Sequence, residues 1–353
     1  MKKLKVGVIG CGNIGTTAHI PAYMADETAE IAWFCDIIRD RAEAQQERVG
    51  TGKVTEDYHE VLADPEVDAI SVCTPNTLHS EITVAALKAG KHVLCEKPAA
   101  YTYDEAVKMQ EARKESGKIL NIGVVNRFND SVIKIKELID AGTLGEIYHV
   151  YVSFRAHRSI PGLGGAFTTK AIAGGGALID WGVHYLDIVM YCTGDPRPKT
   201  VSAETFSKLG VDIENYVYED MWSGPPILDG TYDVDDSVTA LVRTEGPVIT
   251  VHGAWAQNIG AEDRHIDFMG TKAGIRLDYG GGFTLYGTKD GKLTEERFPD
   301  PVTNMFNNEV SDFLACIREG RTNAADIDKA IITSYMMEAM YESAEKHREV
   351  VCD

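Results

Sequence analysis

The strongest constraint on the fold is an alternation of short apolar runs with segments of helical spacing between Leu4 and about Val124. Five runs have the character of strands, at residues 5–10, 30–36, 69–75, 92–98 and 119–125. Between them, apolar residues recur at helical spacing, and two of these segments end at Gly50 and Gly90. Apolar strands that alternate with helices form parallel sheets covered on both faces. We therefore predict an α/β, doubly wound parallel sheet for residues 1–124.

The pattern changes after Asn126. We predict a helix at residues 132–141, a long strand at 147–157, a second helix at 178–194 and several strands between 200 and 288. Helical spacing returns from about Asn308. Since domains hold roughly 100–200 residues, the 353-residue chain should contain a second domain, which we place at residues 125–353. We expect it to be α+β with a mainly antiparallel sheet, and its C-terminal helices to pack back on the first domain.

Charge and cysteine content exclude several classes of partner. The chain has 35 basic and 54 acidic residues, a net charge of −19, and residues 1–124 hold only 14 of the basic and 19 of the acidic ones. Such a surface repels nucleic acid and anionic lipid, and no run approaches the roughly 18 apolar residues of a membrane span. The seven cysteines form no C-x-x-C pair, which is typical of a reducing cytosol. We predict a cytoplasmic protein without a nucleic-acid or membrane partner.

The sequence GCGNIG at residues 10–15 follows the first predicted strand and opens a helix. In this context the first glycine makes the turn, the second admits a pyrophosphate and the third lets helix and strand pack closely. Asp36, at the end of the second strand, can accept hydrogen bonds from ribose hydroxyls and would repel a 2′-phosphate. The pattern predicts a Rossmann domain that binds NAD, while Arg39 and Arg41 leave NADP possible. A glycine turn beside a capping Asp is the alternative.

Two further groups suggest redox chemistry. Lys97 ends a strand on the same sheet edge and can stabilise negative charge on a reacting oxygen, although a solvated Glu–Lys pair would have the same sequence. Three glycines (174–176) lead into a helix in which Asp180 and His184 are spaced i, i+4 and share one face. An imidazole can take a proton from an alcohol as hydride leaves. A capping Asp with a core His, or a pair of metal ligands, are the alternatives.

Four motifs in order, GCGNIG, CTPNTLH (73–79), HVLCEKP (92–98) and GGGALIDWGVHYLD (174–187), resemble the glucose–fructose oxidoreductase/inositol dehydrogenase (Gfo/Idh/MocA) family. The resemblance covers nearly the whole chain. It implies an NAD(P)-dependent oxidoreductase that transfers a hydride between the nicotinamide and a hydroxyl or keto carbon of a sugar, inositol or glycoside. It also implies a large, open sheet in the second domain and a homodimer or homotetramer.

The resemblance further implies roles for individual residues. Lys97, Asp180 and His184 match the family's catalytic Lys and its D-x-x-x-H pair, and no metal is expected. The cofactor-binding residues implied are Gly10, Gly12, Asn13, Ile14, Gly15, Asp36, Thr74, Pro75, Asn76, His79, Glu96 and Lys97.

The substrate is less constrained. Candidates are Arg127, His157 and Arg158, together with Tyr216 and Trp222 in the long acidic segment 207–236, because aromatic faces suit sugar rings. A solvated loop or a subunit contact is the alternative. This segment and the loop after His157 resemble members that oxidise glycosides at a ring carbon. Two other activities stay open, namely a glycosidase that uses bound NAD transiently and a non-catalytic, NAD-responsive binding protein.

Overall fold

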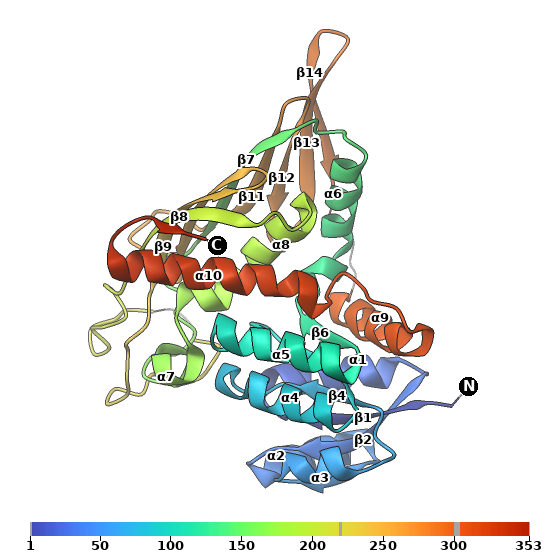
Figure 1. Ribbon diagram of the computed structural model, residues 1–353. Coiled ribbons are helices and arrows are strands. Elements are labelled where there is room, and N and C mark those ends of the chain that lie inside the picture. Colours follow the sequence, from blue (N-terminus) through green and yellow to red (C-terminus); the bar gives the residue numbers. More distant parts are fainter. Residues whose placement is uncertain (1, 219–220, 300–303, 353) are drawn as a thin grey trace. The chain divides into compact units, whose positions relative to one another are not determined.

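The alternating segments of the first part of the chain form a parallel sheet, as predicted. It has six strands rather than the five expected, because the short strand at Lys53–Thr55, with one buried residue, gave no apolar run. The computed structural model describes residues 2–218, 221–299 and 304–352 (Figure 1). The strand order is β3-β2-β1-β4-β5-β6, the order of a dinucleotide-binding Rossmann sheet. The strands are β1 (Leu4–Ile9), β2 (Ala29–Cys35), β3 (Lys53–Thr55), β4 (Ala69–Val72), β5 (His92–Glu96) and β6 (Leu120–Gly123).

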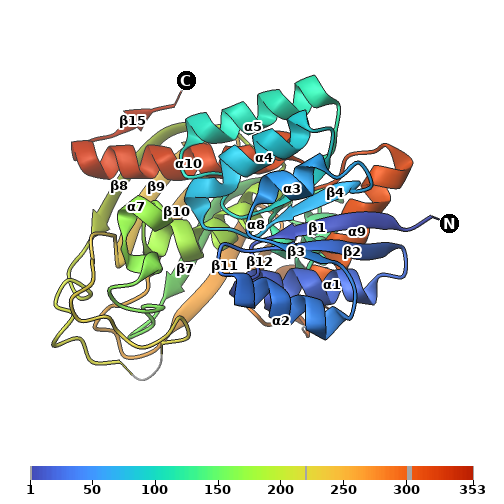
Figure 2. The same cartoon turned by 90° about the horizontal axis from the view of Figure 1, so that it is seen from below.

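Helices cover both faces of this sheet (Figure 2). One face carries α1 (Ile20–Ala25), α2 (Arg39–Val49) and α9 (Met305–Glu319), whose apolar residues share one core with β1, β2 and β4. The other face carries α3 (Tyr58–Ala63), α4 (His79–Lys88) and α5 (Tyr103–Ser116). The helix α9 comes from the end of the chain, so the first compact unit consists of residues Met1–Phe128 and Asn304–Ile331.

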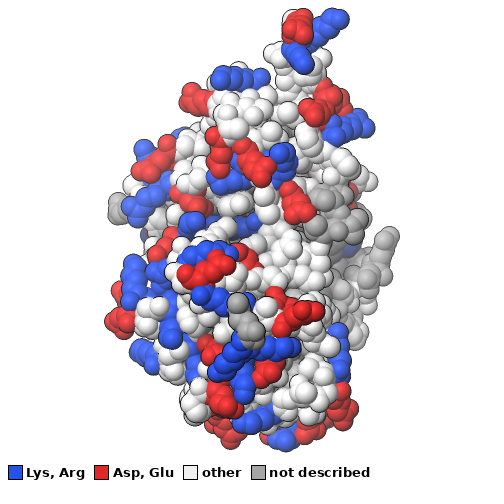
Figure 3. All heavy atoms as spheres, turned by 90° about the vertical axis from the view of Figure 1, so that its right-hand side faces the viewer, with Lys and Arg blue, Asp and Glu red and all other residues white. Residues whose placement is uncertain are grey.

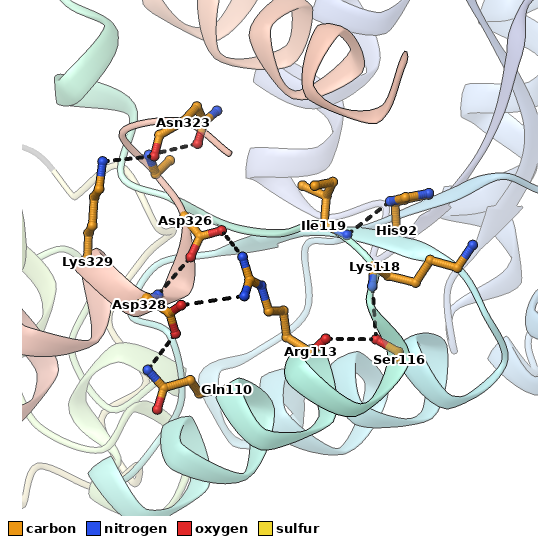
Figure 4. Close-up of polar contacts among 11 residues, drawn as sticks. His92, Gln110, Arg113, Ser116, Lys118, Ile119, Asn323, Asp326, Asp328 and Lys329 are labelled. Carbon is orange, nitrogen blue, oxygen red and sulfur yellow. Dashed lines mark hydrogen bonds and ion pairs between the residues drawn. The ribbon is translucent and has the colours of Figure 1, made fainter. Parts of the chain in front are cut away.

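Polar contacts fasten the late segment to α5 and β6 within this unit (Figure 4). The guanidinium of Arg113 donates to Asp326 at 2.8 Å and to Asp328 at 3.5 Å, and the Gln110 amide donates to Asp328 at 2.7 Å. The Ile122 amide donates to the carbonyl of Ala325 at 2.9 Å. The chain thus returns to the last strand of the parallel sheet about 200 residues after leaving it.

The second unit consists of residues Asn129–Thr303 and Ile332–Asp353 and is built on a nine-stranded sheet. The strand order is β14-β13-β12-β11-β7-β10-β9-β8-β15. All neighbours are antiparallel except β7 and β10, so the expected large, mainly antiparallel sheet is confirmed. The strands are β7 (Ile147–Arg155), β8 (Pro198–Phe206), β9 (Ser237–Thr244), β10 (Val248–Ala254), β11 (Asp263–Gly270), β12 (Gly274–Asp278), β13 (Phe283–Lys289), β14 (Lys292–Phe298) and β15 (Val350–Val351).

One face of this sheet packs against helices and forms the larger core. The helices are α6 (Asp130–Asp140), α8 (Val183–Thr193) and the part of α10 (Ile327–Lys346) that belongs to this unit. A short helix, α7 (Lys170–Ala173), lies in the loops that follow β7. Among the described residues, no helix combines the length and the apolar character that crossing a membrane requires.

Candidate active site

The glycine-rich loop joins β1 to a π-helical turn (Gly15–His19) that continues into α1. Gly10 has a φ of +97°, and a Cβ there would lie 2.4 Å from the carbonyl oxygen of Cys73. A Cβ on Gly15 would lie 2.3 Å from the carbonyl oxygen of Gly10, whereas one on Gly12 would meet no heavy atom within 4 Å. Gly10 and Gly15 therefore permit close packing. Gly12 keeps open the space beside the helix start where a pyrophosphate binds in Rossmann folds. Asn13 and Ile14 complete this loop.

Asp36 lies at the end of β2, and its carboxylate organises the loop. One carboxylate oxygen accepts the Cys11 amide and the other accepts the Ile38 amide, both at 2.8 Å. The side chain is therefore held at the sheet edge, where each oxygen keeps further capacity to accept a ribose hydroxyl. Arg39, considered for NADP, pairs instead with Glu43 at 2.7 Å. These contacts fit an NAD ribose.

The loops after β4 and β5 are tied together by His79. Its ring is almost fully buried and lies between the carbonyl oxygens of Pro98, at 2.8 Å, and Thr74, at 2.9 Å. Burial lowers the pKa of this imidazole. The Thr74 hydroxyl is buried without a hydrogen-bond partner among the described residues, while Pro75 and Asn76 begin the turn that leads to α4. His79 thus holds the two loops on which Thr74, Asn76 and Lys97 were predicted to meet the cofactor.

A buried ion pair between His19 and Glu96 contacts the backbone of Lys97. His19 contacts Ser71 through Nδ1 at 2.7 Å and Glu96 through Nε2 at 2.8 Å, and both members of the ion pair are nearly inaccessible. The second carboxylate oxygen of Glu96 accepts the Lys97 amide at 2.9 Å. Burial opposes both charges, yet contacts with Cys73 and with Glu96 raise the pKa of His19 well above its ordinary value, and the contact with His19 lowers the pKa of Glu96. His19 was not predicted as a site residue, because its only signal in the sequence is its place four residues after Gly15.

Asp180 and His184 lie on one helix of the second unit, as predicted. The helix begins with a π-helical turn (Leu178–Gly182) and continues as α8. Between residues 178 and 185, Asp180, Trp181 and His184 are partly exposed and the others are buried. Trp181 also packs against the guanidinium of Arg264, 4.5 Å from its ring centroid. The spacing therefore places a carboxylate and an imidazole together on a partly exposed face of a largely buried helix.

Four of the predicted substrate residues, His157, Arg158, Tyr216 and Trp222, lie in or beside a small apolar cluster, which we call the loop core. It consists of Ile160, Leu163, Ala177, Tyr216, Met221, Val234, Trp255 and Ala256. The Arg158 guanidinium lies 5.7 Å from the Tyr216 ring centroid and, like His157, contacts the carbonyl of Gln257. Trp222 is 56% exposed and packs edge-on against Phe167. In segment 207–236, Tyr216, Met221 and Val234 pack into this core, whereas many of the other described residues are exposed to solvent. Glu219 and Asp220 lie outside the described residues.

Arg127 lies elsewhere, in the first unit. It is 1% exposed and donates to the carbonyl of Ala324 at 2.8 Å, so at least part of its role is to hold the late segment against β6.

The cysteines at the strand ends are inaccessible. Burial raises the pKa of Cys11 and of Cys35 to about 12, and Cys73 and Cys95 are buried as well. In the part of the chain that the structure describes, no group of three or more His, Cys, Asp or Glu side chains is placed to hold a metal ion.

Comparison with known proteins identifies the family. Residues 4–124 match the oxidoreductase family with an NAD-binding Rossmann fold (GFO_IDH_MocA), and residues 132–276 match the GFO/IDH/MocA C-terminal domain. The chain is 31% identical to D-glucoside 3-dehydrogenase of Escherichia coli, over 97% of this chain and 95% of that protein. It is 26% identical to myo-inositol 2-dehydrogenase of Thermotoga maritima, over 98% of both.

A solved structure of levoglucosan dehydrogenase in complex with NADH and levoglucosan has the same fold, with a TM-score of 0.86 at 24% identity over 99% of each chain. The order of the motifs, the Rossmann strand order and these matches lead to one assignment: the chain belongs to the Gfo/Idh/MocA family of NAD(P)-dependent oxidoreductases.

Proposed function

We propose that this oxidoreductase uses NAD to oxidise a secondary hydroxyl of a neutral glycoside or sugar, with Lys97, Asp180 and His184 as its catalytic residues. The observation that carries the proposal is that Asp180 and His184 lie one turn apart on a largely buried helix and are both partly exposed. The 31% identity to D-glucoside 3-dehydrogenase over almost the whole chain supports a glycoside.

Each residue has a distinct task in this proposal. NAD, when bound, accepts the hydride from the substrate carbon. His184 takes the proton of the reacting hydroxyl, and Asp180 orients the substrate or stabilises the imidazolium. Lys97 donates a hydrogen bond to the same oxygen and stabilises the negative charge that develops there.

We propose NAD as the preferred cofactor. Both carboxylate oxygens of Asp36 are held at the end of β2 by backbone amides, where a 2′-phosphate would meet negative charge. Arg39, which could neutralise that phosphate, is engaged by Glu43. Gly10, Gly12, Asn13, Ile14 and Gly15 would hold the pyrophosphate, with Thr74, Pro75, Asn76, His79, Glu96 and Lys97 on the neighbouring loops.

We further propose a cytoplasmic homo-oligomer, a dimer or a tetramer. Six of the seven cysteines are buried free thiols and the seventh is partly buried, which suits a reducing compartment. The nine-stranded sheet carries helices on one face, and the side chains of the other face, such as Thr239, Leu241 and Thr250, are only partly buried. A second copy could cover that face.

The function is tested by offering sugars, inositols and glycosides with NAD and with NADP, while reduced cofactor and the structure of the product are measured together. We expect NADH to form without cleavage of the glycoside. His184→Ala and Lys97→Met should each lower kcat by about 10²–10⁴-fold, whereas His59→Ala, on the exposed part of α3, should behave as wild type. Cleavage without net NADH, cofactor binding without turnover, or full turnover by His184→Ala would contradict the proposal.

A further inference from the structure

Asp235, near the end of the long segment 207–236, is buried at the start of the helix that carries Asp180 and His184. One carboxylate oxygen accepts the Gly176 amide at 2.8 Å and the hydroxyl of Tyr341 at 2.8 Å. The other accepts the Leu178 amide at 2.9 Å. The carbonyl of Asp235 also accepts the Ala177 amide at 2.9 Å. Three consecutive amides at the helix start are therefore bound by one residue from a distant loop.

The glycines before this helix are required by the same contacts. A Cβ on Gly176 would lie 1.9 Å from the carbonyl oxygen of Asp235, and a Cβ on Gly175 would lie 2.1 Å from the Tyr341 hydroxyl. Neither approach leaves room for a larger residue. Gly175 and Gly176 thus allow Asp235 and Tyr341 to approach the backbone closely. We call this contact between Asp235, Tyr341 and the helix start the junction.

This junction fixes the residues that follow it. The Asp180 amide donates to the carbonyl of Gly176 at 3.0 Å, and His184 lies one turn further along the same helix. A displacement at Gly176 would therefore be passed directly to both side chains. Misplacing a catalytic group by about 1 Å can cost about 10²-fold in rate.

We propose that Asp235 is a positioning residue for the Asp180–His184 pair and that Tyr341 supports it, so that segment 207–236 sets the geometry of the catalytic helix. This inference rests on the proposed function of the pair. It also assigns a task to a long acidic segment. Asp235 acts on the helix, while the next residue, Asp236, binds the amides of Lys208, Leu209 and Gly210 at the start of the segment.

The test compares Asp235→Asn with Asp236→Asn. Both residues are buried carboxylates that accept several backbone amides, so both variants lose similar contacts, but only Asp235 touches the catalytic helix. An amide offers one acceptor oxygen instead of two, so Asp235→Asn must turn a donor toward Gly176 or Leu178. We measure kcat and KM for the best neutral glycoside, the Kd of NADH and amide hydrogen exchange. Tyr341→Phe serves as a milder second variant.

We expect Asp235→Asn to lower kcat at least about tenfold with an unchanged Kd for NADH, and to speed exchange in residues 176–184. Tyr341→Phe should show a smaller loss of the same kind. Asp236→Asn should affect KM rather than kcat and leave exchange in residues 176–184 unchanged.

A kcat for Asp235→Asn within about twofold of wild type, or an equal loss of kcat in both Asn variants, would overturn the inference. If the wild-type protein oxidises none of the substrates, the proposed function fails before any variant is compared. Hydrogen exchange then still decides whether Asp235 holds the helix.

Discussion

His19 and Glu96 form a buried ion pair directly behind Lys97. Breaking such a pair by removing one partner leaves a charge without water or a counterion, which costs about 3–5 kcal/mol. The pair joins the start of α1 to the end of β5, so it binds the glycine-rich loop to the loop of the proposed catalytic Lys97. His19, which has no proposed catalytic role, can in this way hold both the glycine-rich loop and the Lys97 loop in place.

We predict that His19→Gln lowers the free energy of unfolding by about 3–5 kcal/mol near pH 6, and that this loss shrinks at high pH. The pKa of His19 is raised in the folded protein and that of Glu96 is lowered. The His19 contribution is therefore complete below about pH 6.5 and is lost as pH rises through the raised value, while the Glu96 contribution is lost only as pH falls below about 4.3. Urea unfolding of both proteins from mildly acidic to alkaline pH measures the difference. A difference that stays constant would contradict the ion pair.

At the scale of the elements, apolar runs predicted five of the six strands of the parallel sheet because most residues of each of the five are buried. They missed β3, which has only one buried residue. The same reasoning could not find β14, whose residues are nearly all exposed and include four charged side chains, nor the two-residue β15. Both form by backbone pairing with a neighbouring strand, and such pairing cannot be predicted from the hydrophobicity of the side chains. The π-helical turns before α1 and α8 were not predicted either, because one extra residue in a helical turn hardly changes the spacing of apolar residues.

The junction between α5 and the start of α10 leads to a prediction about single elements (Figure 4). Asp326 is 3% exposed, accepts the Asp328 amide at 3.0 Å and pairs with Arg113 at 2.8 Å. Asp326→Asn keeps an oxygen that can accept the Asp328 amide but removes the charge-assisted bond to Arg113, so we expect the free energy of unfolding to fall by about 1.5–3 kcal/mol. Asp328→Asn removes a more exposed and longer pair, at 3.5 Å, and should cost at most about 1 kcal/mol. Denaturant unfolding measures both variants. Equal losses of unfolding free energy would show that burial does not determine how much each Asp–Arg113 pair stabilises the fold.

At the scale of the whole molecule, sequence motifs identified the family and led to the proposed catalytic residues, but they did not predict the contacts that hold those residues. The i, i+4 spacing of Asp180 and His184 placed them on one face because a helix is a local structure. Asp235 lies 55 residues beyond Asp180, and Tyr341 lies 106 beyond Asp235. Contacts between residues so far apart in the sequence depend on how the loops and α10 pack, and this packing cannot be predicted from a local sequence pattern. In the sequence, segment 207–236 stands out only as a long acidic loop with substrate candidates, yet Asp235 and Asp236 are buried acceptors of backbone amides.

The net charge of −19 leads to a prediction about substrate charge. Acidic and basic side chains are intermingled on the face seen in Figure 3, so no single patch dominates there, but the summed field of the molecule still repels anions. With NAD saturating, kcat/KM for a neutral sugar should be nearly independent of ionic strength between about 0.01 and 1 M, where the screening length falls from about 30 to 3 Å. For the phosphate ester of the same sugar, kcat/KM should be lower at low salt and rise as salt is added. A non-ionic osmolyte at matched viscosity controls for effects other than screening. Faster turnover of the ester than of its neutral parent at low salt would show that a local cationic site outweighs the field of the whole protein.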